Sequence, residues 1–310
     1  MSATDTSHWR GIFTILLTPF DDDRALDLES LRREVDFVVA AGVHGIVSPV
    51  NSSEFYLLSD EERRQLVEAV VARANGRVPV VVGVGASNAS TAEALAHHAR
   101  EVGAAGVIAM PPYVLRPSAD VMRDYFARIA RAADGLPLVL QNAGGEVGVP
   151  LASSVVVELA REIPAIRYVK EETVPAPHRI SELLRLGGDA LDGVFGSGTG
   201  GRHLVNEWRR GACGMMSACH LADAQVKVYE AFASGDEAAA RTVLGRQLPA
   251  QNLWQLLGLG LAKEILRRRG VFATAVCRRS VAALDAADHE ELDHALELVR
   301  EDCLWLEGVA

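Results

Sequence analysis

Short apolar runs alternate with amphipathic segments along most of this chain, and this alternation limits the possible folds more than any other feature. The expected strands are 11–18, 45–49, 78–83, 106–109, 137–141, 166–170, 191–195 and 214–217. The expected helices are 28–41, one beginning after Ser59, 91–102, 119–132, 153–161, 177–186, 201–210 and 221–233. Strands that alternate with helices pair in parallel, and eight such units predict a closed (β/α)8 TIM barrel.

Strand signals cease beyond about residue 234. Three further helices are expected there, at 237–246, 251–269 and 290–300. We therefore expect a barrel catalytic domain over 1–233 and a C-terminal helical extension over 234–310. The extension could pack on the flank of the barrel or make a subunit contact, and the pattern leaves both open. A chain of 310 residues is an ordinary length for such a fold.

Charge and cysteine usage exclude several classes of partner. The net charge is −10 and the isoelectric point is near 5.4, which disfavours nucleic acid and anionic membranes. The first nine residues lack the apolar core of a signal peptide, and no apolar segment is long enough to cross a bilayer. The four cysteines form no C-x-x-C pair. We expect a reduced, cytoplasmic protein.

Lys170 is the residue with the clearest chemical potential. The chain has only three lysines, and Lys227 and Lys263 lie in helical patterns where a solvated face is expected. Lys170 instead ends an apolar run, where a buried ammonium must be paired or held partly neutral. A neutral amine is a nucleophile that forms a Schiff base with a ketone. The alternative is a lysine that simply pairs with Glu171 or Glu172.

Position in the barrel favours the chemical interpretation. Active sites of such barrels lie at the C-terminal ends of the strands. The residues expected around that mouth are Thr18, 51–54, 111–113, Gln141, Asn142, Lys170, 196–198 and Ser217.

Four short motifs, in order along these units, give the chain a family resemblance. They are Leu17-Thr18-Pro19-Phe20, Ser53-Glu54-Phe55 with 58–63, Pro112-Tyr113, and Tyr168-Val169-Lys170-Glu171. With them the chain resembles the dihydrodipicolinate synthase / N-acetylneuraminate lyase family of class I Schiff-base lyases over nearly its whole length. The resemblance implies that Lys170 forms the imine with a 2-oxo acid and that the protein is a homo-oligomer, a tetramer or a dimer. It also implies that Tyr113 reaches toward a neighbouring subunit's site, unless that ring only packs on Pro111 and Pro112.

Two departures from the family pattern bear on the substrate. The loop after the second strand reads Val50-Asn51-Ser52-Ser53-Glu54 where the family has Gly-Thr-Thr-Gly-Glu. We expect Asn51, Ser52 and Ser53 to bind the carboxylate of a 2-oxo acid and Glu54 to hold the loop. Gln141 replaces the family's proton-shuttling tyrosine, and Glu146 aligns with its arginine. Because glutamine cannot take a proton, the tyrosine relay cannot operate. Because loss of the arginine removes recognition of a second carboxylate, lysine-pathway synthase activity is not expected.

The pairs Gln141-Asn142 and Lys170-x-Glu172 resemble, more loosely, the 2-keto-3-deoxy-L-arabonate dehydratases. That resemblance predicts an imine on Lys170 followed by loss of a C3 proton and of the C4 hydroxyl as water, with no metal or organic cofactor. Glu172, two residues beyond Lys170, returns to the same side and is the favoured acid/base. It could instead only pair with Lys170 or cap the next helix. Retro-aldol release of pyruvate and a catalytically silent 2-oxo-acid-binding barrel remain alternatives.

The remaining candidates lie on the last two strands. Gly196-x-Gly198-x-x-Gly201 matches a dinucleotide fingerprint but lacks the acidic partner, and a turn that lets backbone approach a substrate is favoured. Ser197 could bind substrate or only shape that turn. Ser217 and Met216 are expected at the substrate pocket, although Met215 and Met216 could simply fill the barrel. His220 is more simply a satisfied loop histidine, and the histidines and cysteines lack zinc-ligand spacing.

Overall fold

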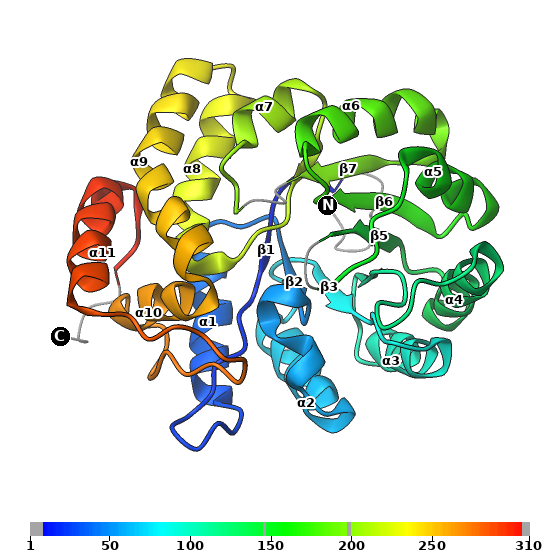
Figure 1. Cartoon of the computed structure of the whole chain (residues 1–310), viewed down its shortest axis with the longest axis horizontal. Coiled ribbons are helices and arrows are strands. Elements are labelled where there is room, and N and C mark those ends of the chain that lie inside the picture. The colour runs from blue at the N-terminus through cyan, green and yellow to red at the C-terminus, as the bar shows by residue number, and fades with distance from the viewer. Residues whose placement is uncertain (1–8, 145–146, 197–199, 306–310) are drawn as a thin grey trace.

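Eight parallel strands close into a barrel in sequence order, with β1 paired to both β2 and β8. This computed structural model describes residues 9–144, 147–196 and 200–305. The strands are β1 (Gly11–Ile15), β2 (Gly45–Ser48), β3 (Val80–Gly83), β4 (Gly106–Ala109), β5 (Leu138–Asn142), β6 (Ile166–Glu171), β7 (Gly193–Gly196) and β8 (Gly214–Met215). The predicted fold class, a (β/α)8 TIM barrel with a C-terminal helical extension, is confirmed (Figure 1).

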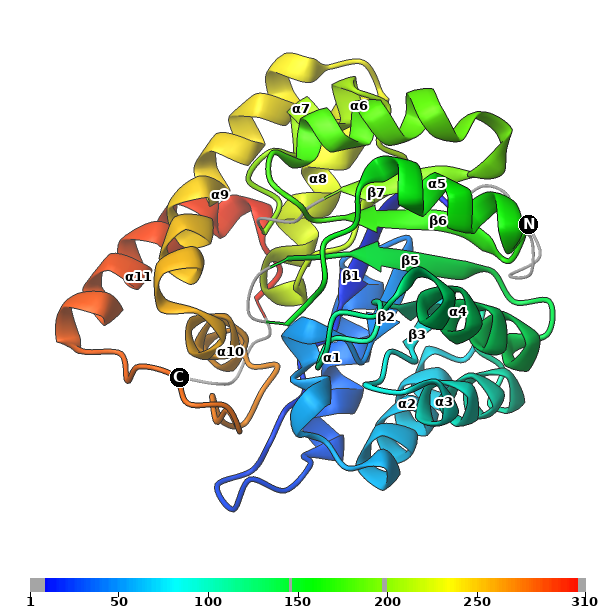
Figure 2. The same ribbon diagram turned by 45° about the vertical axis from the view of Figure 1, so that its right-hand side comes forward.

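A helix follows each strand and covers the outside of the barrel (Figure 2). These helices are α1 (Leu28–Ala40), α2 (Asp60–Ala74), α3 (Ala89–Glu101), α4 (Ala119–Ala133), α5 (Ser153–Glu162), α6 (Ala176–Gly187), α7 (Leu204–Arg209) and α8 (Ala222–Ala233). The predicted start of α2 is confirmed. Ser59 accepts from the backbone N–H of Glu62, and Glu62 accepts from that of Ser59.

Alternation along the strands builds two separate apolar layers. One layer lies between the sheet and the helices and is the larger core. The other fills the barrel itself, and its buried members are Trp9, Phe13, Ile15, Val47, Val50, Val81, Ile108, Val139, Tyr168, Phe195, Cys213 and Met216. The barrel interior is therefore packed below its mouth.

Several elements are shorter than their apolar runs. The run predicted as a strand from 214 to 217 pairs only over Gly214–Met215. The helix predicted over 201–210 begins only at Leu204, because Gly200 and Gly201 adopt left-handed φ values of 68° and 84°. An apolar run indicates which residues are buried and not which ones pair, and residues beyond the last paired residue of a strand can still be buried.

The C-terminal extension differs from its prediction in where it breaks. α9 (Glu237–Leu257) continues without a break past Pro249, although two separate helices were predicted over this stretch, and Gly258 caps its C-terminal end. A proline inside a helix removes one backbone donor, which packing of α9 against α8 and α11 (Ala286–Val299) offsets. Gly258, with φ 76°, makes the true break before α10 (Leu259–Arg268). α9, α10 and α11 gather on one side of the barrel, beside α8 and α1 (Figure 1).

Candidate active site

Lys170 points into the barrel near the C-terminal end of β6. Tyr168, two residues earlier on the same face, belongs to the barrel interior, whereas Val169 on the opposite face packs toward the helices. Lys170 is only 2% exposed. The Lys170 side chain therefore points into the barrel, as expected from the sequence.

Glu172 meets the amine directly. Lys170 Nζ lies 2.9 Å from Glu172 Oε1, and Gln141 Nε2 donates to the same oxygen at 2.6 Å. Gln141 is the β5 residue in register with Lys170. The Glu172 side chain is 20% exposed and the Lys170 side chain 3%, so the carboxylate lies on the solvent side of the amine. The three predicted catalytic residues thus form one contiguous group, in which the carboxylate can exchange a proton with the amine.

Asn142 does not join this group, contrary to its prediction as a substrate-binding residue. It lies on the outer face of β5, in register with Glu171. Its amide donates to Leu151 O at 3.1 Å and Glu171 Oε2 at 2.8 Å, and its carbonyl accepts from Leu151 N. Glu171 also accepts from Thr173 N, and burial raises the pKa of this carboxyl. The alternation of side chains along a strand separates this outward pair from the inward pair Gln141–Lys170.

The loop after β2 divides its hydroxyl groups between two tasks. The Ser53 hydroxyl donates to Leu16 O at 2.5 Å and accepts from Val50 N at 3.1 Å, and Thr18 Oγ1 donates to Ser53 O. Ser53 is fully buried, so its predicted contact with substrate is replaced by a role in shaping the loop. Asn51 and Ser52 instead face a pocket.

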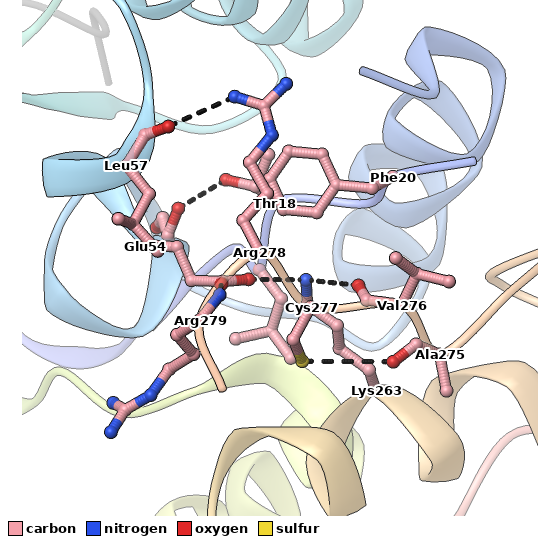
Figure 3. Close-up of polar contacts among 12 residues, drawn as sticks. Thr18, Phe20, Glu54, Leu57, Lys263, Ala275, Val276, Cys277, Arg278 and Arg279 are labelled. Atoms are coloured by element: carbon pink, nitrogen blue, oxygen red, sulfur yellow. Dashed lines mark hydrogen bonds and ion pairs between the residues drawn. The ribbon is translucent and has the colours of Figure 1, made fainter. Parts of the chain in front are cut away.

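Glu54 closes this loop through a buried ion pair. Its Oε1 lies 2.6 Å from Lys263 Nζ on α10, and both side chains have 0% exposure (Figure 3). Glu54 itself adopts a left-handed φ of 53°. The expectation that Glu54 holds its loop agrees with these contacts, but the solvated position expected for Lys263 is wrong. An ammonium is tolerated there because it also donates to Val276 O at 2.8 Å and lies 4.5 Å from the Phe20 ring.

A pocket of about 280 Å³, here called the outer pocket, opens beside Asn51 and Ser52. Its other walls come from the segment after β5 and from the C-terminal extension. The lining residues are Asn51, Ser52, Tyr56, Gly144, Val147, Trp254, Gln255, Gly258, Leu259 and Arg279. The extension therefore contributes to the candidate site.

A smaller cavity of about 10 Å³, here called the inner cavity, reaches Gln141. Val50, Phe55 and Met110 also line it. The two spaces are neighbours, because Asn51 Nδ2 on the outer pocket contacts Met110 Sδ at 3.5 Å.

Tyr113 is half-buried with its ring edge-on to Phe55, at 5.6 Å between centroids. The observed ring contact is with Phe55, whereas the packing alternative named Pro111 and Pro112, and the predicted contact of Tyr113 with a second subunit stays a prediction.

The described candidates at the ends of β7 and β8 differ in what surrounds them. A side chain at Gly196 would meet Glu207 Oε2 of α7 at 2.3 Å, so this position faces the helices, and Gly196 O accepts from Met216 N. Ser197 lies outside the described residues. Met216 is part of the packed barrel interior. Ser217 O accepts from Ile15 N, and its buried hydroxyl contacts no partner in the described parts of the chain.

The His220 side chain is fully buried beside α9. Its ring lies 4.9 Å from that of Trp254 on α9, and burial lowers the pKa of the imidazole to about 3.

Within residues 9–144, 147–196 and 200–305, no three His, Cys, Asp or Glu side chains are grouped so that they could hold a metal ion. In the same ranges, no helix combines the length and apolar character needed to cross a membrane.

Three contributors to the site were not predicted from sequence. Lys263, Arg279 and Trp254 all come from the C-terminal extension. The signal for Lys263 was available: it interrupts the apolar stretch 259–266, where an unpaired lysine is rarely tolerated. Arg279 and Trp254 carry no comparable local signal, because nothing in their neighbourhood in the sequence points to a loop more than 190 residues away.

Comparison with known proteins agrees with this architecture. The model of the dihydrodipicolinate synthetase family matches residues 8–299. The chain is 34% identical to an L-2-keto-3-deoxyarabonate dehydratase from Azospirillum brasilense over 298 residues, covering 94% of this chain and 95% of the relative. It is 32% identical to a 4-hydroxy-tetrahydrodipicolinate synthase from Chlorobium chlorochromatii over 244 residues, 78% of this chain and 80% of the relative.

Solved structures show the same fold. A dihydrodipicolinate synthase from Rhodopseudomonas palustris superposes with a TM-score of 0.86 at 28% identity, covering 94% of this chain and 98% of the other. YagE, a prophage protein of the dihydrodipicolinic acid synthase family from E. coli K12 solved in complex with pyruvate, superposes with a TM-score of 0.87 at 25% identity. That match covers 94% of this chain and 99% of the other.

Proposed function

The chain belongs to the dihydrodipicolinate synthetase family of Schiff-base lyases, and on that premise we propose that it dehydrates a 2-keto-3-deoxy sugar acid through an imine on Lys170. The observation that carries the proposal is the 2.9 Å contact between the Lys170 amine and the Glu172 carboxylate at the mouth of the barrel. The name of the Azospirillum brasilense relative, which is similar over 94% of this chain, supports the same substrate class.

The reaction begins at Lys170 Nζ. Glu172 takes a proton from the ammonium, and the free amine adds to the C2 ketone. Glu172 returns this proton to the former ketone oxygen, which leaves as water to give a protonated imine and a Glu172 carboxylate that is again free to act as a base. The imine acts as an electron sink that eases removal of a C3 proton. Glu172 accepts this proton, and the C–H electrons form an enamine. No metal or organic cofactor takes part in this proposal.

Elimination then follows from the enamine. Its electrons form the C3–C4 double bond as the C4 hydroxyl leaves, protonated by Glu172, so that one water departs. Water then adds at C2, which releases the unsaturated 2-oxo acid and restores Lys170. In a five-carbon product a proton then moves from C5 to C3, and the resulting C4–C5 enol tautomerises to the semialdehyde with no further change in composition. Imine formation releases one water and hydrolysis consumes one, so the net reaction is loss of a single water from the substrate.

Gln141 supports dehydration over carbon–carbon cleavage. It occupies the position of the family's proton-shuttling tyrosine and can only hold Glu172 Oε1, at 2.6 Å. Glu172 is then the proton-transferring group at the amine. Retro-aldol release of pyruvate is the second candidate, because an aldol cleavage also needs only one base near the imine. We further propose that the protein is a homo-oligomer, as the family resemblance implies.

Borohydride trapping followed by mass mapping tests the proposal. With pyruvate or a five-carbon 3-deoxy-2-oxo acid present, we expect a reduced adduct on Lys170. Incubation without borohydride should yield a dehydrated semialdehyde product and no pyruvate. Pyruvate as the product would show retro-aldol cleavage, and absence of any adduct on Lys170 would leave only the silent-barrel alternative.

A further inference from the structure

Among the described residues, those below Lys170 leave a bound substrate no room to extend into the barrel. Below the lysine the barrel is filled by Phe13, Val139, Tyr168 and Phe195, which are all buried. Carbon atoms beyond the imine would therefore extend toward the mouth, where Gln141 lines the inner cavity and Asn51, which contacts Met110 of that cavity, lines the outer pocket. The outer pocket, at about 280 Å³, is large enough for several carbon atoms with their hydroxyl groups.

Arg279 is the one cationic side chain among the described residues that line the outer pocket. Ser52 and Gln255 add neutral polar groups, and Val147 and Trp254 provide apolar wall. A guanidinium carries five N–H donors in a planar fork, which suits a ligand with several oxygen acceptors. The lining is thus built for a polyhydroxylated chain.

The same carboxylate that closes the β2 loop also fixes the position of Arg279. The backbone N–H of Arg279 donates to Glu54 Oε2 at 2.8 Å, while Glu54 Oε1 holds Lys263 at 2.6 Å. The guanidinium Nη1 donates to Tyr56 OH at 3.3 Å. Figure 3 shows the Arg279 side chain pointing away from Lys263 and Arg278. Because Asn51 and Ser52 precede Glu54 in one short loop, Glu54 sets Arg279 and the expected carboxylate-binding groups relative to each other.

We propose that Arg279 is a specificity-determining residue that binds the hydroxyl groups at the far end of the substrate. It selects 3-deoxy-2-oxo acids of five or more carbons over pyruvate-sized acids. This inference rests on the proposed function, since it requires the substrate to be anchored at Lys170. Pyruvate ends at its C3 methyl group and has no hydroxyl groups, so imine formation between pyruvate and Lys170 does not involve Arg279.

The test compares Arg279→Gln with a matched neighbour, Arg278→Gln. Arg278 pairs with Glu62 and lies 4.4 Å from the Phe20 ring, and it does not line the outer pocket. For each protein, the concentration of ligand giving half-maximal borohydride trapping is measured with pyruvate and with a five-carbon 3-deoxy-2-oxo acid. The ratio of the two values is the readout, and thermal unfolding of each variant checks its fold.

We expect Arg279→Gln to raise the value for the five-carbon acid about tenfold or more and that for pyruvate by less than about twofold. Arg278→Gln should leave the ratio unchanged, and Arg279→Lys, which keeps the charge but loses the planar fork, should fall between. An equal rise for both ligands would place Arg279 at the carboxylate, and an unchanged ratio would remove it from recognition; either result overturns the inference. A wild-type protein that traps neither acid refutes the proposed function itself, which separates the two failures.

Discussion

Glu172 Oε1 lies 2.9 Å from Lys170 Nζ and also accepts the Gln141 amide at 2.6 Å. One carboxylate oxygen thus has two donors, one of which is the proposed nucleophile. A carboxylate in this position both compensates the buried ammonium and offers a place for its proton. The structural and the catalytic interpretations of Glu172 therefore describe the same contact, and the Glu172→Gln variant described below distinguishes them.

Replacement of Lys170 by methionine should abolish imine chemistry. We expect at least about a thousandfold loss of turnover and no borohydride adduct with pyruvate, because the other two lysines are paired elsewhere, Lys263 with buried Glu54 and Lys227 with Asp302. Lys227→Met is the control, since Lys227 is an exposed lysine on α8 whose loss should leave trapping intact. Residual adduct on the Lys170→Met protein would show that the imine forms elsewhere.

Replacement of Glu172 by glutamine should slow proton transfer more than imine formation. We expect about a hundredfold slower exchange of the pyruvate methyl protons in D₂O, measured by NMR, with an adduct still trapped at long times. Glu171→Gln is the matched control, because Glu171 faces the helices and bonds Asn142. Equal exchange rates in the wild-type and Glu172→Gln proteins would assign the proton transfer to another group.

The pair Glu54–Lys263 should behave as a buried charge pair. Lys263→Met leaves the Glu54 carboxylate buried without its partner, and we expect a loss of about 3–5 kcal/mol in the free energy of unfolding, measured with urea. The double variant Lys263→Met/Glu54→Gln should recover most of that loss. The neutral amide carries no charge to compensate and still accepts from the Arg279 backbone. A double variant as unstable as the single one would mean that packing of the lysine stem, and not its charge, matters.

Glu34 on α1 should make stability depend on pH. Its Oε1 accepts from Leu17 N at 2.8 Å and from Cys219 Sγ at 3.0 Å, and burial raises the pKa of this carboxyl to about 8. The folded state therefore holds a proton that the unfolded state loses near pH 4.5. Stability from this group is full below that pH and is lost as the pH rises through about 8.

Glu34→Gln removes this titration. Between pH 5.5 and pH 8, the free energy of unfolding of the wild-type protein should fall by roughly 3 kcal/mol more than that of the variant. Urea unfolding at four pH values in this window measures the difference directly. Parallel pH profiles for the two proteins would show that the folded carboxyl is already ionised at pH 5.5.

The sequence by itself determined the barrel, because eight apolar runs at regular spacing leave few other ways to bury their side chains. It also determined the inward direction of Lys170 and the return of Glu172 to the same side, since both follow from the two-residue period of a strand and its immediate continuation. Those are local properties, and local patterns were sufficient to predict them.

Only the tertiary structure decided which polar groups remain available around that lysine. Asn142 and Ser53 looked as suitable as Gln141 and Ser52 in the sequence, yet their hydrogen bonds are used by Leu151 and Leu16, which pairing and loop closure bring near. Lys263 and Arg279 meet Glu54 across more than 200 residues of chain. Which buried charge finds which partner depends on how the extension packs on the barrel, and no local periodicity encodes that contact.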